Sequence, residues 1–322
     1  MKKVLFATTA LVATAGVAAA DVTFGGYGRF GIIYSGAAGA NGIAQTFGDD
    51  GTGDSSVDVT SRFRLQIEAT AETDAGVTLG ARVRIEQEND EIFTPPAGDG
   101  SFNGTGINAP RFFARAGGLE VGVGNIYGAL EFMPGMYPID LGLTGLQYEY
   151  TPYQFGGDAY DSDGAGAAIT NNAVEVMYSM GDMSLHVSAS DGANERLAAH
   201  AAYKWNGWTF AVGGQDSNSL TDTEFAASVG GVIGPVKVSL AYADNGINGD
   251  QVTLAGSFDV GAATTIDAYV SDADTIFGTP TQNTSYGIGV HHDLGGGVSI
   301  RGGAAKLFAG HTIADMGVRF NF

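Results

Sequence analysis

The chain has 322 residues, with 15 basic and 35 acidic side chains for a formal net charge of −20, and it contains no cysteine. Such an acidic balance argues against nucleic acid as a partner, and the lack of cysteine excludes a fold held by disulfides. The 18 Phe, 13 Tyr and 2 Trp are too many for a disordered acidic chain, and the 51 glycines show no collagen period. The sequence therefore predicts a folded protein that closes without covalent crosslinks.

The first twenty residues have the pattern of an export signal. The chain opens with MKK, runs without a charge from Val4 to Ala20, and ends this run in three alanines before Asp21. A basic start, a short apolar stretch and a small-residue cleavage point are typical of a secretory signal peptide. We predict cleavage after Ala20 and a single exported domain over 21–322. Because no later apolar run reaches about 18 residues, any membrane crossing must be made by strands.

Sixteen segments alternate apolar with small or polar residues, which predicts strands. They are 22–34, 62–68, 77–86, 111–116, 119–124, 173–180, 183–190, 197–205, 208–215, 224–232, 236–243, 251–259, 264–271, 285–292, 298–305 and 315–322. Short turns such as 73–76, 180–182 and 206–207 alternate with longer loops rich in Gly, Asp, Asn and Ser. This arrangement is typical of hairpins in an outer-membrane barrel.

The polarity of the two strand faces separates a membrane barrel from a soluble exported β-sandwich, which would also alternate. In 315–322 one face carries Met316, Val318, Phe320 and Phe322, and the other carries Asp315, Gly317, Arg319 and Asn321. A sandwich would turn large apolar side chains inward, whereas a polar second face suits a water-filled lumen. The sequence therefore predicts an all-β, transmembrane antiparallel barrel of 16 strands, wide enough for an aqueous channel.

A group of arginines occupies the polar face of the first three predicted strands. Its members are Arg29, Arg62, Arg64, Arg82 and Arg84. Because like charges on adjacent strands repel, we expect acidic groups opposite this basic wall. A second interpretation is that the arginines extend to a rim or pair with Glu68, Glu86 and Glu88.

The longest stretch without strand alternation is about 125–172, where Pro134, Pro138 and Pro152 interrupt a glycine-rich acidic sequence. Because loops of this length are usually functional, we expect it to fold into the lumen as a constriction. Glu131, Asp140 and Glu149 would then face the arginines across a transverse field that favours small polar solutes. An acidic loop that faces only solvent remains the alternative.

The remaining motifs give little support for a metal site or a catalytic site. Asp161-x-Asp163-Gly164 resembles part of a calcium loop but lacks the downstream glutamate and the flanking helices. It is a weak calcium site at most, and we expect no other cofactor. No grouping of nucleophile, acid and base stands out, so we expect no enzymatic activity.

Three segments resemble general diffusion porins of the Gram-negative outer membrane, of the type found in alphaproteobacteria such as photosynthetic purple bacteria. They are the opening GGYGRF at 25–30, the segments VGN at 123–125 and GALE at 128–131 with Pro134-Gly135, and the closing ADMGVRFNF at 314–322. The resemblance implies a sixteen-stranded barrel, a homotrimer, a third loop folded inward with Glu131 as its acid, and an assembly signal at Phe322. It also implies contact with membrane lipid, lipopolysaccharide and the outer-membrane assembly machinery.

The expected function is passive transport of small hydrophilic solutes and ions across the outer membrane. The main alternative is a substrate-specific outer-membrane channel, because Tyr148, Tyr150 and Tyr153 would suit an aromatic binding surface for a solute. A barrel enzyme and an adhesin are further alternatives. Net acidity favours cations, while arginines at the narrowest point would reduce that preference. We therefore expect weak cation selectivity.

Overall fold

The computed structural model of the chain describes residues 20–36, 56–88, 105–154, 173–191, 195–217, 223–276, 279–280 and 284–322. Nearly all of the predicted signal peptide lies outside these residues, so its cleavage stays a prediction. Within the described part no helix is long and apolar enough to cross a membrane.

The described chain is built almost entirely of strands. In order they are β1 (Asp21–Ser35), β2 (Ser56–Glu72), β3 (Thr78–Glu88), β4 (Thr105–Ile107), β5 (Arg111–Ala116), β6 (Leu119–Gly124), β7 (Ala173–Met180), β8 (Met183–Ser190), β9 (Arg196–Trp205), β10 (Trp208–Ser217), β11 (Glu224–Ile233), β12 (Val236–Asp244), β13 (Asp250–Val260), β14 (Thr264–Ala273), β15 (Thr275–Ile276), β16 (Thr279–Pro280), β17 (Ser285–Gly295), β18 (Val298–Lys306) and β19 (Thr312–Asn321). Two short 3₁₀ turns, η1 (Leu146–Tyr148) and η2 (Gly246–Asn248), interrupt the connections.

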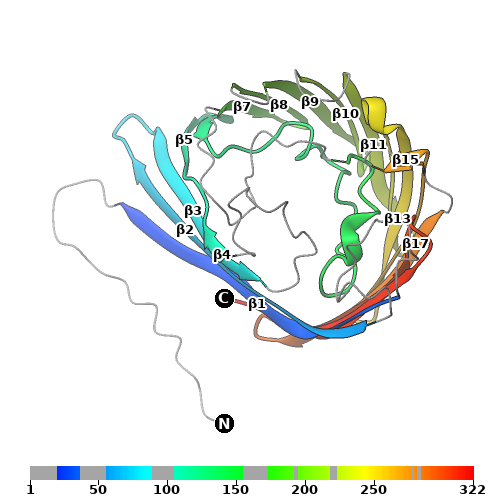
Figure 1. The fold of residues 1–322 in the computed structure, drawn as a ribbon. Coiled ribbons are helices and arrows are strands. Elements are labelled where there is room, and N and C mark those ends of the chain that lie inside the picture. The colour runs from blue at the N-terminus through cyan, green and yellow to red at the C-terminus, as the bar shows by residue number, and fades with distance from the viewer. Residues whose placement is uncertain are drawn as a thin grey trace, which may run out of the picture.

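The strands form one closed antiparallel barrel, which Figure 1 shows as a ring. Strand β1 pairs with β2 on one side and with β19 on the other, from Tyr27 opposite Asn321 to Ser35 opposite Ile313. Strand β3 pairs with both β4 and β5, which act as one interrupted strand. With β15 and β16 forming a separate small pair, the barrel has sixteen strands, and the sequence-based prediction is confirmed.

The two faces of the barrel differ as the alternation predicts. In β9, Leu197 is 60% exposed while its neighbours Arg196 and Ala198 are 3% and 1% exposed. In β19, Met316 and Phe320 are exposed whereas Asp315 is buried. A closed barrel turns alternate side chains outward and inward, so the exposed apolar side chains form a surface suited to lipid.

The described part of the connection between β6 and β7, residues 125–154, lies inside the ring of strands (Figure 1). Two apolar clusters join it to the wall. One includes Leu130, Met133 and Met136 of the connection against small wall residues such as Ala202 and Ala226. The other includes Leu141, Leu146 and Tyr150 against wall residues on β1, β13, β14, β18 and β19. In the first cluster the inner wall is lined with alanine, because small side chains leave room for the connection.

The largest differences from the predicted strands are an extension of one strand and the presence of three short strands. Strand β2 runs from Ser56 to Glu72 instead of 62–68, because its alternation continues through Val57 and Val59, which are exposed on the outer face. The short β4 and the β15–β16 pair were not predicted. Segments of two or three residues are too short for a period to be read from sequence.

Candidate pore constriction

The connection between β6 and β7, here called the inner connection, is attached to the barrel wall by one buried carboxylate at residues 142–144, here called its tip. Asp315 on β19 accepts hydrogen bonds from the backbone N–H of Leu143 at 3.0 Å, from the N–H of Thr144 at 2.7 Å and from the Thr144 hydroxyl at 2.8 Å. On the neighbouring strand, Arg29 Nη1 donates to the carbonyl oxygen of Leu143 at 3.1 Å. Charge-assisted bonds to backbone groups are strong and directional, so these contacts fix the tip relative to β1 and β19.

Glycines on the wall make room for this tip. A Cβ added at Gly31 or at Gly317 would lie 2.7 Å from Cδ2 of Leu143. Gly142 of the tip has φ +66°, and a Cβ there would lie 2.5 Å from Oδ1 of Asp315. Close backbone approach and a left-handed conformation both require glycine. Gly31 and Gly317 therefore form a surface without side chains on β1 and β19, here called the glycine floor, against which Leu143 packs.

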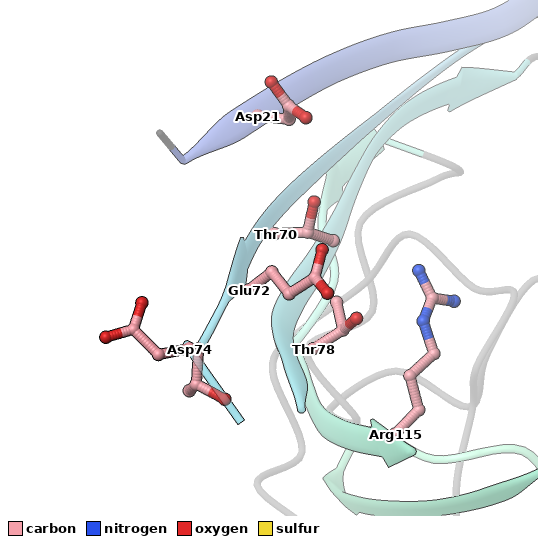
Figure 2. A pocket seen from close by; sticks show the side chains of 7 residues that line it. Asp21, Thr70, Glu72, Asp74, Thr78 and Arg115 are labelled. Atoms are coloured by element: carbon pink, nitrogen blue, oxygen red, sulfur yellow. The ribbon is translucent and has the colours of Figure 1, made fainter. Parts of the chain in front are cut away.

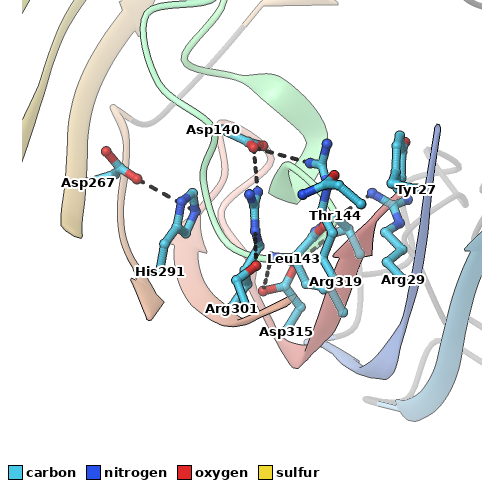
Figure 3. A network of polar contacts seen from close by, with 12 residues as sticks. Tyr27, Arg29, Asp140, Leu143, Thr144, Asp267, His291, Arg301, Asp315 and Arg319 are labelled. Atoms are coloured by element: carbon cyan, nitrogen blue, oxygen red, sulfur yellow. Dashed lines mark hydrogen bonds and ion pairs between the residues drawn. The ribbon is translucent and has the colours of Figure 1, made fainter. Parts of the chain in front are cut away.

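This attachment places Asp140 against two arginines of the last strands (Figure 3). Asp140 Oδ2 lies 2.5 Å from Arg301 Nη1 on β18 and 3.3 Å from Arg319 Nη1 on β19. The side chain of Asp140 is 52% exposed, whereas those of Arg301 and Arg319 are 14% and 23% exposed. An acid of the inner connection thus meets a basic wall inside the barrel.

The basic wall includes a row of arginines on β2, β1, β19 and β18, where the last strand pairs with the first. This arginine row consists of Arg62, Arg29, Arg319 and Arg301. Arg29 lies directly opposite Arg319 on β19 and directly opposite Arg62 on β2. Arg301 lies opposite Gly317, two positions from Arg319. Adjacent guanidinium groups of like charge need compensating carboxylates, and Asp140 supplies one of them.

Arg62 and Arg64 share a single carboxylate within the wall. Both form ion pairs with Glu86 on β3, with Arg62 Nη2 3.3 Å from Glu86 Oε1. Arg62 Nη1 donates to the hydroxyl of Tyr27 at 3.2 Å, and the guanidinium of Arg319 lies 4.1 Å from the centre of the Tyr27 ring. The second interpretation of the sequence, pairing with neighbouring glutamates, therefore describes part of the contacts of these two residues.

The remaining predicted arginines lie further along the wall. The guanidinium of Arg82 lies 4.3 Å from the ring centre of Tyr127, at the start of the inner connection. Arg84 Nε donates to Gln66 at 3.3 Å, and its backbone N–H donates to the side chain of Asn108 at 2.6 Å. The contact of Arg82 supports the base of the connection on β3, and those of Arg84 link β3 to β2 and to the segment after β4.

The other two predicted loop acids have different surroundings. Glu131 lies in the connection with a half-buried side chain. Glu149 accepts a hydrogen bond from the backbone N–H of Phe308 at 2.8 Å, in the loop between β18 and β19. Burial raises the pKa of Glu149 to about 7 despite this bond and one to Ser285. Its carboxylate thus ties the connection to the β18–β19 loop.

A second ionic cluster holds the start of the connection. Arg111 on β5 bonds Glu175 on β7 at 2.5 Å and Glu120 on β6 at 2.6 Å. The other oxygen of Glu175 accepts from the backbone N–H of Tyr127 at 3.1 Å and contacts His186 at 3.0 Å. The connection is therefore anchored on opposite sides of the barrel.

A polar cavity of about 520 Å³ lies where β2 and β3 are joined by their short turn (Figure 2). Asp21, Glu72, Asp74 and Arg115 line it together with three threonines. These residues belong to the strand ends and the turn, so the cavity belongs to the rim and is separate from the Asp140 ion pairs.

No metal-binding cluster of three or more His, Asp or Glu residues occurs among the described residues. The weak calcium candidates Asp161 and Asp163 lie outside them. Phe322, the predicted assembly signal, stacks on Phe63 with ring centres 5.7 Å apart, and its backbone pairs with Gly26.

The sequence analysis did not identify three residues of the site. Arg301 and Arg319 pair with Asp140, and Asp315 bonds the tip. All three lie on inward positions of predicted strands. The signal that identifies them is barrel closure, since the last strand must lie beside the first and Arg319 therefore beside Arg29.

A closed antiparallel barrel with an apolar outer face and an ion-paired inner loop defines the class of outer-membrane channel proteins. The model of the Gram-negative porin family matches residues 7–309, and the chain belongs to this family. It is 32% identical to a porin of Fuscovulum blasticum and 28% identical to a porin of Rhodobacter capsulatus, in each case over 94% of this chain and all of the relative. An engineered triple mutant of Rhodopseudomonas blastica porin superposes with a TM-score of 0.74 at 29% identity, covering 94% of this chain and all of that one. The protein is an outer-membrane β-barrel.

Proposed function

We propose that this porin is a general diffusion channel, which carries small hydrophilic solutes and ions passively through a constriction between Asp140 and the arginine row. The observation that carries the proposal is the pair of contacts from Asp140 to Arg301 and Arg319. Fixed opposite charges in a water-filled passage orient polar solutes and raise the cost for apolar ones, which would have to disrupt ordered water. Arg29 and Arg62 continue the basic side, with Arg64, Arg82 and Arg84 further along the wall.

Weak cation selectivity is part of this proposal. The chain has 35 acidic and 15 basic residues, which favours cations at the entrances. The arginine row opposes this preference at the constriction. Acidic contributions from Glu131 and from the rest of the predicted constriction segment up to 172 add to the same balance.

The proposed working form is a homotrimer in the outer membrane, delivered through the signal peptide and inserted by the assembly machinery, which reads Phe322. Its outer face would contact lipid and lipopolysaccharide. The exposed apolar side chains on the outer face of the strands support burial in lipid or against a second copy. We propose neither enzymatic activity nor a nucleic-acid partner, and calcium would bind only weakly at Asp161 and Asp163.

Single-channel recording of the purified protein in planar bilayers tests the function. We expect stepwise conductance that rises in proportion to salt concentration and a small reversal potential of cation sign in a salt gradient. Liposome swelling with sugars of increasing size should show a gradual size cut-off. Absence of ion conduction by correctly folded protein would refute the channel, and a several-fold anion preference would refute the selectivity.

One observation favours the substrate-specific alternative. Tyr137 and Tyr148 of the inner connection are 47% and 41% exposed, so their rings offer flat apolar surfaces to a solute. Saturation of flux by one solute class would support this alternative, whereas linear flux for all small solutes would support general diffusion.

A further inference from the structure

Aromatic rings are displayed on the inner connection, on the lumen side of the barrel. Tyr137, Tyr148 and Phe132 are each exposed by more than a third, although they lie on the segment that packs inside the ring of strands. Large exposed apolar side chains on the strands face outward, where lipid would cover them. Lipid cannot cover the three rings of the connection, so their exposure calls for another explanation.

The backbone that carries Tyr148 is held in a disfavoured conformation. After Gly145 at φ +90°, the three residues of η1 all have positive φ: Leu146 at 45°, Gln147 at 69° and Tyr148 at 57°. Residues with a Cβ rarely adopt this region, and consecutive examples are held only by surrounding packing. Here Leu146 is fully buried against the wall while Tyr148 stays in the lumen. Such strain is found where a side chain must be presented.

The orientation of the Tyr148 ring is fixed by its neighbours. It covers Gly145, where an added Cβ would lie 2.3 Å from the ring carbon Cζ. Tyr137 meets it nearly edge-on, with ring centres 6.3 Å apart and an interplanar angle of 87°. Buried Tyr150 also contacts it, with ring centres 5.7 Å apart, and contacts Tyr269 of β14 in turn. Tyr137 and Tyr148 thus form an aromatic corner that rests on the wall.

Positive charge borders this corner. Arg29, Arg62 and Asp140 are all within electrostatic reach of the Tyr148 hydroxyl. Asp140 is occupied by Arg301 and Arg319. Glu86 is shared by Arg62 and Arg64, as Asp140 is by the other two arginines, so each of these carboxylates balances only one of its two arginines. The surroundings therefore combine a flat apolar surface with net positive charge.

We propose that Tyr148 and Tyr137, with Arg62, form a subsite for planar aromatic carboxylates. The ring of the solute would stack on Tyr148 while its carboxylate pairs with the guanidinium of Arg62, which is 17% exposed. This inference rests on the proposed diffusion function, because it assigns a preferred solute class to the same passage.

Block of ion current tests the subsite. With purified channels in planar bilayers, benzoate should reduce the current at a concentration roughly two- to tenfold lower than cyclohexanecarboxylate, which has the same charge and similar size but no aromatic ring. Benzamide, which has the ring without the charge, should block more weakly than benzoate. The Tyr148→Leu variant should lose the difference between benzoate and cyclohexanecarboxylate, and Tyr148→Phe should keep it.

Leucine is a suitable replacement because Leu146, two residues earlier, also has a positive φ. Tyr137→Leu provides a second variant if Tyr148→Leu folds poorly, and it should reduce the difference in the same direction. Tyr203→Leu, on the outer face of β9, is the matched control and should behave like the wild type. Equal block by benzoate and cyclohexanecarboxylate in a conducting wild-type channel overturns the subsite alone. A wild type that does not conduct overturns the proposed function itself.

Discussion

Replacing Asp140 by asparagine tests the charge balance of the constriction. The change removes one negative charge and leaves Arg301 and Arg319 without their shared carboxylate. Because Asp140 is 52% exposed, loss of the ion pairs should cost the fold less than about 1 kcal/mol. The effect should therefore appear in ion selectivity and not in folding.

The size of the effect follows from Coulomb's law. A unit charge acting on an ion at roughly 5 Å in water contributes about 0.8 kcal/mol. Screening with a Debye length of about 10 Å in 0.1 M salt reduces this to about 0.5 kcal/mol. That energy lowers the local cation concentration and raises the local anion concentration by about twofold each, so the permeability ratio of cations to anions should fall about fivefold.

The assay is the reversal potential of single channels in a KCl gradient centred near about 0.1 M, where screening is moderate. Asp259→Asn is the control, because Asp259 is an exposed acid at the end of β13 that bonds Thr265, away from the arginine row. The reasoning is refuted if Asp140→Asn leaves the reversal potential unchanged, or if Asp259→Asn shifts it as much.

Three other perturbations follow from the same contacts. Asp315→Ala leaves two buried backbone N–H groups without their acceptor at about 1–3 kcal/mol each, so open-channel current noise should rise well above that of Asp259→Ala; equal noise would contradict the anchoring role. The pKa of Glu149 is raised from 4.5 to about 7 by burial, so its contribution to stability is complete below about pH 4.5 and is lost as the pH rises to about 7. Denaturation in detergent should show this slope in the wild type and lose part of it in Glu149→Gln, and an unchanged slope would speak against it. Phe322→Ala removes the stacking on Phe63 and should lower the amount of assembled barrel in the outer membrane, whereas undiminished assembly would show that the terminal ring is dispensable.

The barrel could be predicted because each strand repeats its two-residue pattern for long enough to be read. The last strand illustrates this, since Met316 and Phe320 are exposed and Asp315 is buried as the alternation requires. Antiparallel order then follows from the short turns. The interruption between β4 and β5 could not be foreseen, because it depends on how Asn108 bonds the backbone of Arg84.

The constriction was predictable in its charges but not in its pairing. Arg29 and Arg62 were identified from the inward face of their strands, and they lie directly opposite each other. Which acid meets which arginine depends on how an irregular segment docks, and that is decided by Asp315 and the glycine floor far away in the sequence. For this reason Asp140 was found to pair with Arg301 and Arg319, while Glu149 contacts Phe308.

The docking of the inner connection also sets an order for biogenesis. Leu143 and Asp315 are separated by 172 positions in the chain, and the floor beneath the tip is completed only when the final strand lies beside the first. A nascent chain that lacks its carboxyl-terminal hairpin lacks Asp315 and Gly317, so it offers only the part of the docking surface that β1, β13 and β14 supply. The narrow passage therefore takes its final form only after the last strand has closed the barrel.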